Sequence, residues 1–260
     1  MSNFTIDPYR FGVDCSANVI SCSNKAYNFD GVDDWLKMTD HDDFSFDAVN
    51  NGSDINLAHS ICVYLKRDDV TANEALYCKG NGTSSLEYRI FFMGDDLYCD
   101  TYDATLALYS RMHYSNLSIS NGTWFHLAIG FGTTSSEVDA WVDGVKLTGG
   151  STGGGTGDME NLSTMFRIGD MPQSGNWHYE GLLMQFMLWK DHKLIQEEVD
   201  YLYDSGNSLR NPTVDCGDYQ QSSKLKLWLK YENGVDHSGN GHDMVLKEGS
   251  THDTTGDTPC

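Results

Sequence analysis

One stretch of the chain carries the side chains that a sugar-binding site requires. Between positions 170 and 179 it holds an acid, an amide and three ring-bearing residues: Asp170, Asn176, Trp177, His178 and Tyr179. Sugar recognition needs an aromatic ring that stacks on the ligand and a few fixed polar groups for its hydroxyls. We therefore predict a ligand-binding loop at these five residues. The competing interpretation is that Trp177 is partly buried beneath its own loop.

A second candidate for chemistry is the carboxylate pair Glu137 and Asp139. Alternate residues of a strand project to the same face, and two neighbouring carboxylates are what glycoside hydrolysis uses. Glu87 and Glu180 stand alone in the sequence. Neither a Ser–His–Asp order nor a G-x-S-x-G turn is present, so catalysis by an activated serine is not expected.

Two histidines near the C-terminal end are conceivable metal ligands. His237 and His242 lie five residues apart, with Asp236 and Asp243 beside them. A zinc site normally has three or four protein ligands, and two histidines define only part of one. The competing interpretation is a polar turn, because the segment is rich in Gly, Asn and Asp.

The net charge limits the partners of the chain. Seventeen Lys and Arg residues oppose 38 Asp and Glu residues, which gives a formal net charge of −21. Such a surface repels nucleic acid and anionic membranes. The start of the chain carries no Sec signal, and no run of 18 apolar residues occurs. We expect neither a nucleic-acid partner nor membrane insertion.

The cysteines are odd in number, so they cannot all pair within one chain: Cys15, Cys22, Cys62, Cys78, Cys99, Cys216 and Cys260. Three of them, at 62, 78 and 99, lie in strand-like runs without C-x-x-C or metal-ligand spacing. We predict that these three are small buried hydrophobic residues of a protein made in a reducing cytosol.

The segments that carry these candidate residues are predicted to be mainly β-strands. Apolar and polar residues alternate over 61–66, 86–92, 97–99, 104–112, 125–131, 138–147, 165–169 and 181–189. Asp143-Gly144 predicts a tight hairpin, and the Gly/Ser/Thr run from Thr148 to Gly157 predicts a flexible surface loop. The single helical pattern covers 195–203.

Many short strands at this spacing predict an all-β fold: a two-sheet antiparallel jelly-roll sandwich with one short helix in the C-terminal half. No break in composition divides residues 26–260, which we expect to form a single domain. Residues 1–25 lack strand periodicity and form an N-terminal arm. Because the arm carries several apolar side chains, we expect it to dock on a neighbouring subunit; packing on its own domain is the alternative.

Four segments, in this order, resemble the laminin-G-like, concanavalin A-like lectin/glucanase jelly-roll family. They are Y-N-F-D-G-V-D-D-W at 27–35, N-G-T-W-F-H-L-A at 121–128, A-W-V-D-G-V at 140–145, and 166–181 leading into the helix. An E-N-G…D-x-S-G-N-G segment usually precedes the first strand of this family, but here it follows the helix, at 232–241. We expect it to complete the sandwich from the C-terminal side; the start of a second repeat is the alternative.

The resemblance also bears on metals and catalysis. It favours Asp33, Asp236 and Asn240 as ligands of at most a structural Ca²⁺, since oxygen atoms in turns suit this ion; no cofactor is required. Glucanase members of the family carry E-x-D-x-x-E along one strand, whereas Val142 stands where the third acid belongs. We therefore expect no enzyme activity.

The resemblance extends to components of tailed-bacteriophage virions. It implies a non-enzymatic structural or binding protein on the virion surface, as capsid decoration or fibre component, made in a host cytoplasm. Its partners would be further copies of the chain, in a homo-oligomer, and other virion structural proteins. The alternative is a carbohydrate-binding lectin module that attaches to cell-surface glycans, and such a chain would be extracellular.

Overall fold

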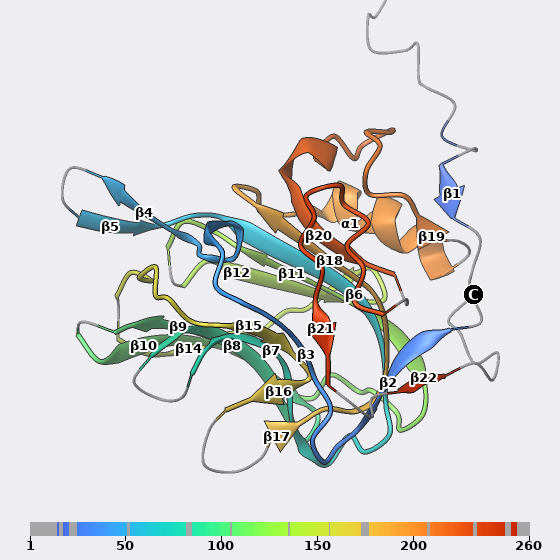
Figure 1. Ribbon diagram of the computed structural model, residues 1–260, viewed down its shortest axis with the longest axis horizontal. Coiled ribbons are helices and arrows are strands. Elements are labelled where there is room, and N and C mark those ends of the chain that lie inside the picture. Colours follow the sequence, from blue (N-terminus) through green and yellow to red (C-terminus); the bar gives the residue numbers. More distant parts are fainter. Residues whose placement is uncertain are drawn as a thin grey trace, which may run out of the picture.

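Alternating strands pair into two antiparallel sheets that face each other, which we call the upper and lower sheets after their places in Figure 1. The computed structural model describes residues 15, 18–20, 25–50, 53–81, 85–104, 106–134, 136–155, 157–172, 177–206, 209–230, 233–247 and 251–253. The predicted all-β sandwich with one short helix is confirmed. Among the described residues, no helix is long and apolar enough to cross a bilayer.

The lower sheet has the strand order β14 (Ser151–Gly154), β10 (Leu108–Tyr114), β9 (Asp96–Asp103), β8 (Leu86–Met93), β7 (Asn73–Gly80), β15 (Phe166–Ile168), β3 (Leu36–Met38) and β21 (Val245–Leu246). The upper sheet has the order β13 (Val145–Lys146), β12 (Val138–Val142), β11 (Trp124–Phe131), β6 (His59–Arg67), β18 (Glu180–Lys190), β2 (Ala26–Asp30) and β22 (Thr251–Asp253), and β20 (Leu225–Leu229) also pairs with β18.

Within the described ranges, three two-stranded ribbons lie outside these sheets: β1 (Val19–Ile20) with β19 (Leu209–Arg210), β4 (Asp47–Asn50) with β5 (Ser53–Asn56), and β16 (Asp170–Met171) with β17 (Trp177–His178). The helices are α1 (Gln196–Tyr203) and the 3₁₀ turns η2 (Asp42–Phe44), η3 (Asp204–Gly206) and η4 (Ser222–Lys224).

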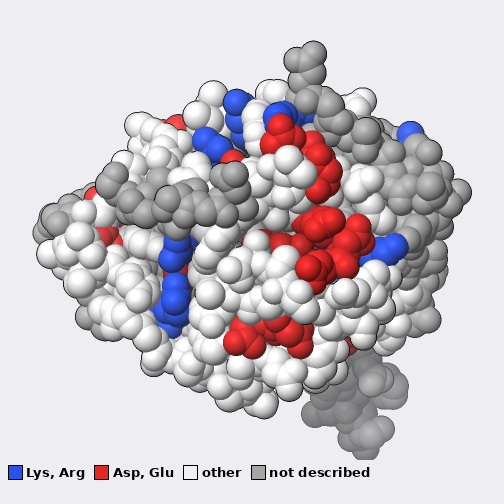
Figure 2. Space-filling view, turned by 90° about the horizontal axis from the view of Figure 1, so that it is seen from below, with Lys and Arg blue, Asp and Glu red and all other residues white. Residues whose placement is uncertain are grey.

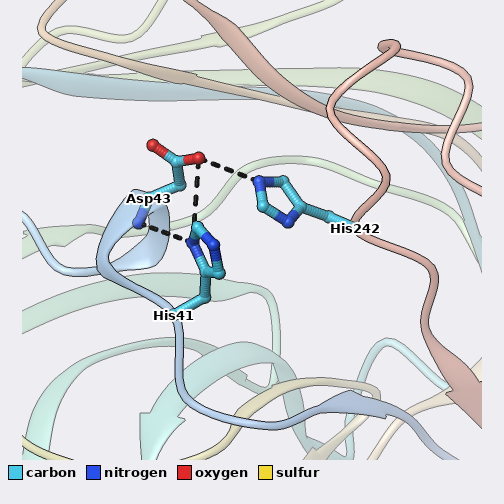
Figure 3. A group of neighbouring side chains, drawn as sticks. All are labelled: His41, Asp43 and His242. Atoms are coloured by element: carbon cyan, nitrogen blue, oxygen red, sulfur yellow. Dashed lines mark hydrogen bonds and ion pairs between the residues drawn. The ribbon is translucent and has the colours of Figure 1, made fainter.

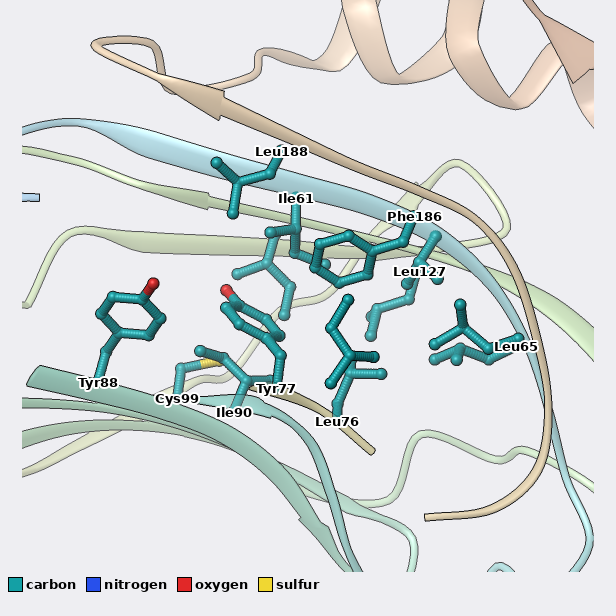
Figure 4. Packing of buried hydrophobic residues seen from close by; sticks show 14 of the residues in the cluster. Ile61, Leu65, Leu76, Tyr77, Tyr88, Ile90, Cys99, Leu127, Phe186 and Leu188 are labelled. Carbon is teal, nitrogen blue, oxygen red and sulfur yellow. The ribbon is translucent and has the colours of Figure 1, made fainter. Parts of the chain in front are cut away.

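The main core fills the space between the two sheets (Figure 4). Ile61, Val63 and Leu65 of β6 all enter it, as their period of two predicts. Facing them, Tyr88 and Ile90 of β8 enter from the lower sheet. Full burial of one such aliphatic side chain stabilises the fold by about 1.5–3 kcal/mol. The alternation therefore determines which face of each strand points inward.

A third layer covers the outer face of the upper sheet. Val199 and Leu202 of α1 pack with Trp189 and Trp228 in a second buried cluster, and Figure 1 shows the helix above this sheet. Because both of its faces are covered, nearly all of β6 is buried. The predicted helix over 195–203 is confirmed within one residue.

The hairpin at Asp143-Gly144 is also confirmed. Both residues have positive φ, 49° and 74°, as a tight turn between β12 and β13 requires. The prediction of an unstructured loop over 148–157 is wrong in part, because β14 forms within it and pairs with β10. The backbone of a glycine-rich segment can form hydrogen bonds with the edge strand of a sheet, although its side chains show no alternation of apolar and polar residues.

The strands after the helix add to both sheets: β20 pairs with β18 and β21 pairs with β3. The E-N-G…D-x-S-G-N-G segment that connects them thus helps to complete the sandwich from the C-terminal side, which was the preferred interpretation of its unusual position.

The described part of residues 1–25 contacts its own chain. Val19–Ile20 pairs with Leu209–Arg210, and Cys15 forms a disulfide with Cys216 at a Cα–Cα distance of 5.8 Å. An oxidising environment maintains such a bond, so the disulfide argues against the expectation of a protein made in a reducing cytosol. The three strand cysteines at 62, 78 and 99 are free and buried, as predicted. Most of the other arm residues lie outside the described part, and docking on a neighbour stays a prediction.

Candidate functional site

A row of five charged residues and one cysteine crosses the outer face of the lower sheet. Residues directly opposite one another on neighbouring antiparallel strands share a face. Strand pairing forms one such row that runs from β3 to β10. Its members are, in order, Lys37, Arg167, Cys78, Arg89, Asp100 and Arg111. Figure 2 shows this side of the molecule, where one narrow stripe of basic side chains stands apart from several acidic patches.

Asp100 holds the two arginines of this row that belong to β8 and β10. Its carboxylate is buried and accepts bonds from Arg111 Nε (2.6 Å) and Nη2 (2.7 Å) and from Arg89 Nε (2.8 Å). The hydrogen bonds to Asp100 also raise the pKa of Arg111 above its usual value. Bidentate pairing of this kind fixes the plane of a guanidinium group. The arginines are therefore held in place before any ligand arrives.

Aromatic rings flank the arginines on both sides. Tyr98 stacks on Phe91 and on His113, at centroid distances of 5.1 Å and 4.3 Å. On the other side Tyr109 pairs with Tyr102. The Arg111 guanidinium lies 4.9 Å from the Tyr98 ring and 5.2 Å from the Tyr109 ring.

We call this surface, formed by Tyr98, Tyr109, His113, Arg89 and Arg111 over Asp100, the aromatic–arginine face. Tyr109 is 40% exposed, and the side chains of Arg111 and His113 are about one quarter exposed (25% and 26%). The face thus combines accessible ring surface with oriented hydrogen-bond donors. These are the two elements that sugar recognition needs.

The predicted ligand-binding loop borders the same surface. Trp177 lies 5.2 Å from Phe91, and Asp170 accepts a hydrogen bond of 2.6 Å from Arg167, a member of the basic row. His178 is half-buried opposite Asp170 in the β16–β17 ribbon, with Nδ1 3.5 Å from its carboxylate. Asn176 lies outside the described residues.

Tyr179 has a different environment from the rest of the predicted loop. It is fully buried against Phe29, and its hydroxyl donates to the Leu182 carbonyl. This side chain therefore stabilises the core and offers no exposed surface to a ligand.

Sequence reasoning missed the aromatic–arginine face, although a signal for it exists. Tyr98-x-Asp100-x-Tyr102 and Tyr109-x-Arg111-x-His113 place only aromatic and charged residues on the outward positions of two adjacent strands. Exposed apolar surface that gathers in one place and is rimmed by polar groups often marks a binding site. Outward rings on neighbouring strands indicate a binding surface.

The three predicted calcium ligands fall into two separate groups. Asp33 lies with Asp30 and Asp34, within reach of one cation, but it also forms an ion pair with Lys247. Asp30 and Asp34 accept hydrogen bonds from nearby backbone N–H groups. A Ca²⁺ ion at this turn stays a proposal.

Asp236 and Asn240 organise a different turn. The Asp236 carboxylate accepts hydrogen bonds from the backbone N–H groups of Trp228, Ser238 and His242, and from the Ser238 hydroxyl. The Asn240 amide donates to the carbonyl of Leu225. These contacts give both side chains a structural role.

The carboxylates Glu137 and Asp139 both lie near lysines, and one buried cysteine lies beside a histidine. Asp139 forms ion pairs with Lys146 and Lys193, and Glu137 lies 3.8 Å from the same Lys193. The sulfur of Cys62 lies 2.6 Å from His126 Nε2, as in a nucleophile–base pair. However, burial raises the pKa of the Cys62 thiol and lowers the pKa of His126 to about 3. An activated cysteine needs the opposite shift of the thiol pKa.

The solved structures confirm this type of fold. A heptameric SAP-like pentraxin from Limulus polyphemus has a TM-score of 0.51 at 12% identity, over 90% of this chain and 96% of its own. A putative carbohydrate binding protein from Bacteroides ovatus has a TM-score of 0.53 at 13% identity, over 88% of this chain but only 59% of its own. No curated protein matches the sequence significantly. The Laminin_G_3 model matches residues 30–200, and the chain therefore belongs to the concanavalin A-like lectin/glucanases superfamily.

Proposed function

We propose that the chain is a non-enzymatic glycan-binding module and that the aromatic–arginine face is its binding surface. One observation carries the proposal: a buried carboxylate, Asp100, holds Arg111 between two tyrosine rings on an outward sheet face. Because these side chains are already ordered, less conformational entropy is lost when a ligand binds. The similar fold of a protein described as carbohydrate binding adds support.

The face offers complementary contacts for a sugar. The exposed ring of Tyr109 provides an apolar surface for the C–H groups of a pyranose, and Arg111 and His113 provide polar groups for hydroxyls. The edge of the face near β14 is hollowed, with a cavity of about 150 Å³ lined in part by Arg111, Thr152 and Gly153. A ligand that stacks on Tyr109 has room to extend toward this edge.

The test is a glycan array probed with the full chain, followed by calorimetric titration of any hit. Tyr109→Ala should weaken binding about fivefold or more, since one ring contact contributes around 1 kcal/mol. Val145→Ala is the control, because Val145 is also exposed (69%) but belongs to the upper sheet. A silent array, or equal affinity of both variants, would contradict the proposal.

The sequence resemblance suggests a more specific setting, and we keep it as part of the proposal: display on a tailed-phage virion as decoration or fibre. The disulfide between Cys15 and Cys216 agrees with any location outside a reducing cytosol, virion surface or extracellular. Mass spectrometry of purified particles tests the virion location. Light scattering of the purified chain tests the expected homo-oligomer.

A further inference from the structure

Three side chains with metal-binding atoms meet between two loops that are far apart in the sequence. His41 precedes the turn η2, Asp43 lies in it, and His242 lies in the segment before β21. One potential ligand atom from each residue lies within 4.8 Å of the others. Figure 3 shows both imidazole rings turned toward the Asp43 carboxylate.

The distances are close to those of a metal site. His242 Nε2 lies 2.9 Å from Asp43 Oδ2, and His41 Nδ1 lies 3.7 Å from the same oxygen. The ring centroids of His41 and His242 are 4.4 Å apart. Ligands at about 2.0–2.2 Å from a tetrahedral Zn²⁺ lie roughly 3.3–3.5 Å from one another. Small side-chain rotations therefore suffice to surround an ion.

Both histidines can supply a lone pair, although His242 Nε2 must first lose the proton that it donates to Asp43 Oδ2. His41 Nδ1 accepts a hydrogen bond of 3.1 Å from the Asp43 backbone N–H, so this nitrogen is unprotonated, as a metal ligand must be. A metal would take the lone pair that now accepts this bond. Lys226 Nζ, 3.0 Å from Asp43 Oδ1, holds the other carboxylate oxygen. Asp43 Oδ2 thus faces the two rings while its partner oxygen is fixed by a cation.

The third ligand is anchored by its own surroundings. The backbone N–H of His242 donates to Asp236, and its ring packs edge-on against Phe44 at 5.1 Å. Only 6% of His242 is exposed, whereas 48% of the His41 side chain is exposed. One side of the cluster is therefore rigid and the other is open to an ion and a water molecule.

We propose that His41, Asp43 and His242 bind a divalent transition-metal ion of the Zn²⁺ type. Two imidazoles and one carboxylate select such an ion over Ca²⁺, which prefers six or more oxygen ligands. The ion ties the C-terminal loop to the β3–β4 connection, 199 residues away in sequence. A fourth position, on the side of His41, is left for water. This inference does not depend on the glycan-binding proposal.

The experiment uses the full chain after removal of metals with a chelator. Co²⁺ is titrated as a spectroscopic probe, and Zn²⁺ is then added in competition. We expect one equivalent of Co²⁺ to give the visible absorption of a nitrogen- and oxygen-ligated ion, and Zn²⁺ to displace it. His41→Gln should weaken binding at least tenfold, by analogy with the ~10–100-fold losses that follow changes around metal sites.

The control variant is His237→Gln, which changes a histidine of the same C-terminal loop that packs on Trp228 and lies outside the cluster. It should bind Co²⁺ like the unchanged chain. Because His41 is exposed, His41→Gln should fold normally, and circular dichroism checks this. Equal affinities of the two variants, or no saturable binding, would overturn the proposal. Preference for Ca²⁺ over Zn²⁺ would also overturn it.

Discussion

The disulfide between Cys15 and Cys216 should be a major source of stability. The perturbation is the double variant Cys15→Ser/Cys216→Ser. The bond links residues 201 positions apart, and the loop-closure entropy that it removes from the unfolded chain corresponds to about 5 kcal/mol at 25 °C. Measured effects are commonly smaller than this limit, so we expect a loss of about 2–5 kcal/mol in the free energy of unfolding.

The folded state gives a second reason for this loss. Cys216 is buried beside Tyr219, and the ring of Tyr219 stacks on Tyr201 of α1. Asn18, near the other end of the bond, donates a hydrogen bond of 2.5 Å to the Tyr201 hydroxyl. Breaking the bond should release the described part of the arm together with these contacts.

The assay is urea unfolding followed by tryptophan fluorescence, with and without a reductant. The unchanged chain should lose stability on reduction, whereas the double variant should show the same low midpoint in both conditions. The three described free cysteines form no disulfide, so a reductant should not act through them. An unfolding midpoint that neither reduction nor the substitutions change would refute the reasoning.

Three further predictions concern pH, metal and assembly. Burial lowers the pKa values of His59 and His126 to about 3. The unfolded chain therefore binds protons at these histidines more readily than the folded chain, and the free energy of unfolding falls as the pH drops from 6.5 toward 3. Each histidine should lower the free energy of unfolding by about 3 kcal/mol at pH 4 relative to pH 7. His59→Phe should reduce this loss, measured by urea unfolding at a series of acidic pH values. An unchanged loss would contradict the lowered pKa of His59. If Ca²⁺ binds at Asp33, it should raise the melting temperature of chelator-treated protein by linkage, and Asp33→Asn should abolish the increase; an identical melting curve without Ca²⁺ removes the site. If the arm joins subunits, deletion of residues 2–24 should lower the number of subunits in the oligomer, as measured by its mass in solution. An unchanged number of subunits would show that the arm does not join them.

The buried histidine His59 illustrates how packing determines such a pKa. Its ring is stacked between Phe46, at a centroid distance of 3.7 Å, and Phe131, at 4.2 Å. Two apolar faces leave no water to solvate a charged imidazolium, so the neutral form is favoured. Nothing in the sequence around position 59 reveals this environment, because its two phenylalanine rings come from other segments: Phe46 precedes β4 and Phe131 ends β11.

Much of the fold was predictable because its signals are local. The period of two in Ile61, Val63 and Leu65 assigns a strand and its inward face, and Asp143-Gly144 assigns a hairpin through its backbone preference. The helix at α1 follows from its apolar spacing. Each of these depends on neighbours within a few residues, and the sequence displays such neighbours directly.

The functional surfaces depended on the tertiary structure. The aromatic–arginine face exists because strand register sets Arg89, Asp100 and Arg111 side by side, and a shift of one residue would turn them inward. The His41–Asp43–His242 cluster joins segments 199 residues apart. By itself, the sequence determined the fold class and the inward faces of the strands, because these follow from short-range periodicity. Only the tertiary structure decided which outward groups meet, because register and loop packing are long-range properties of the whole sandwich.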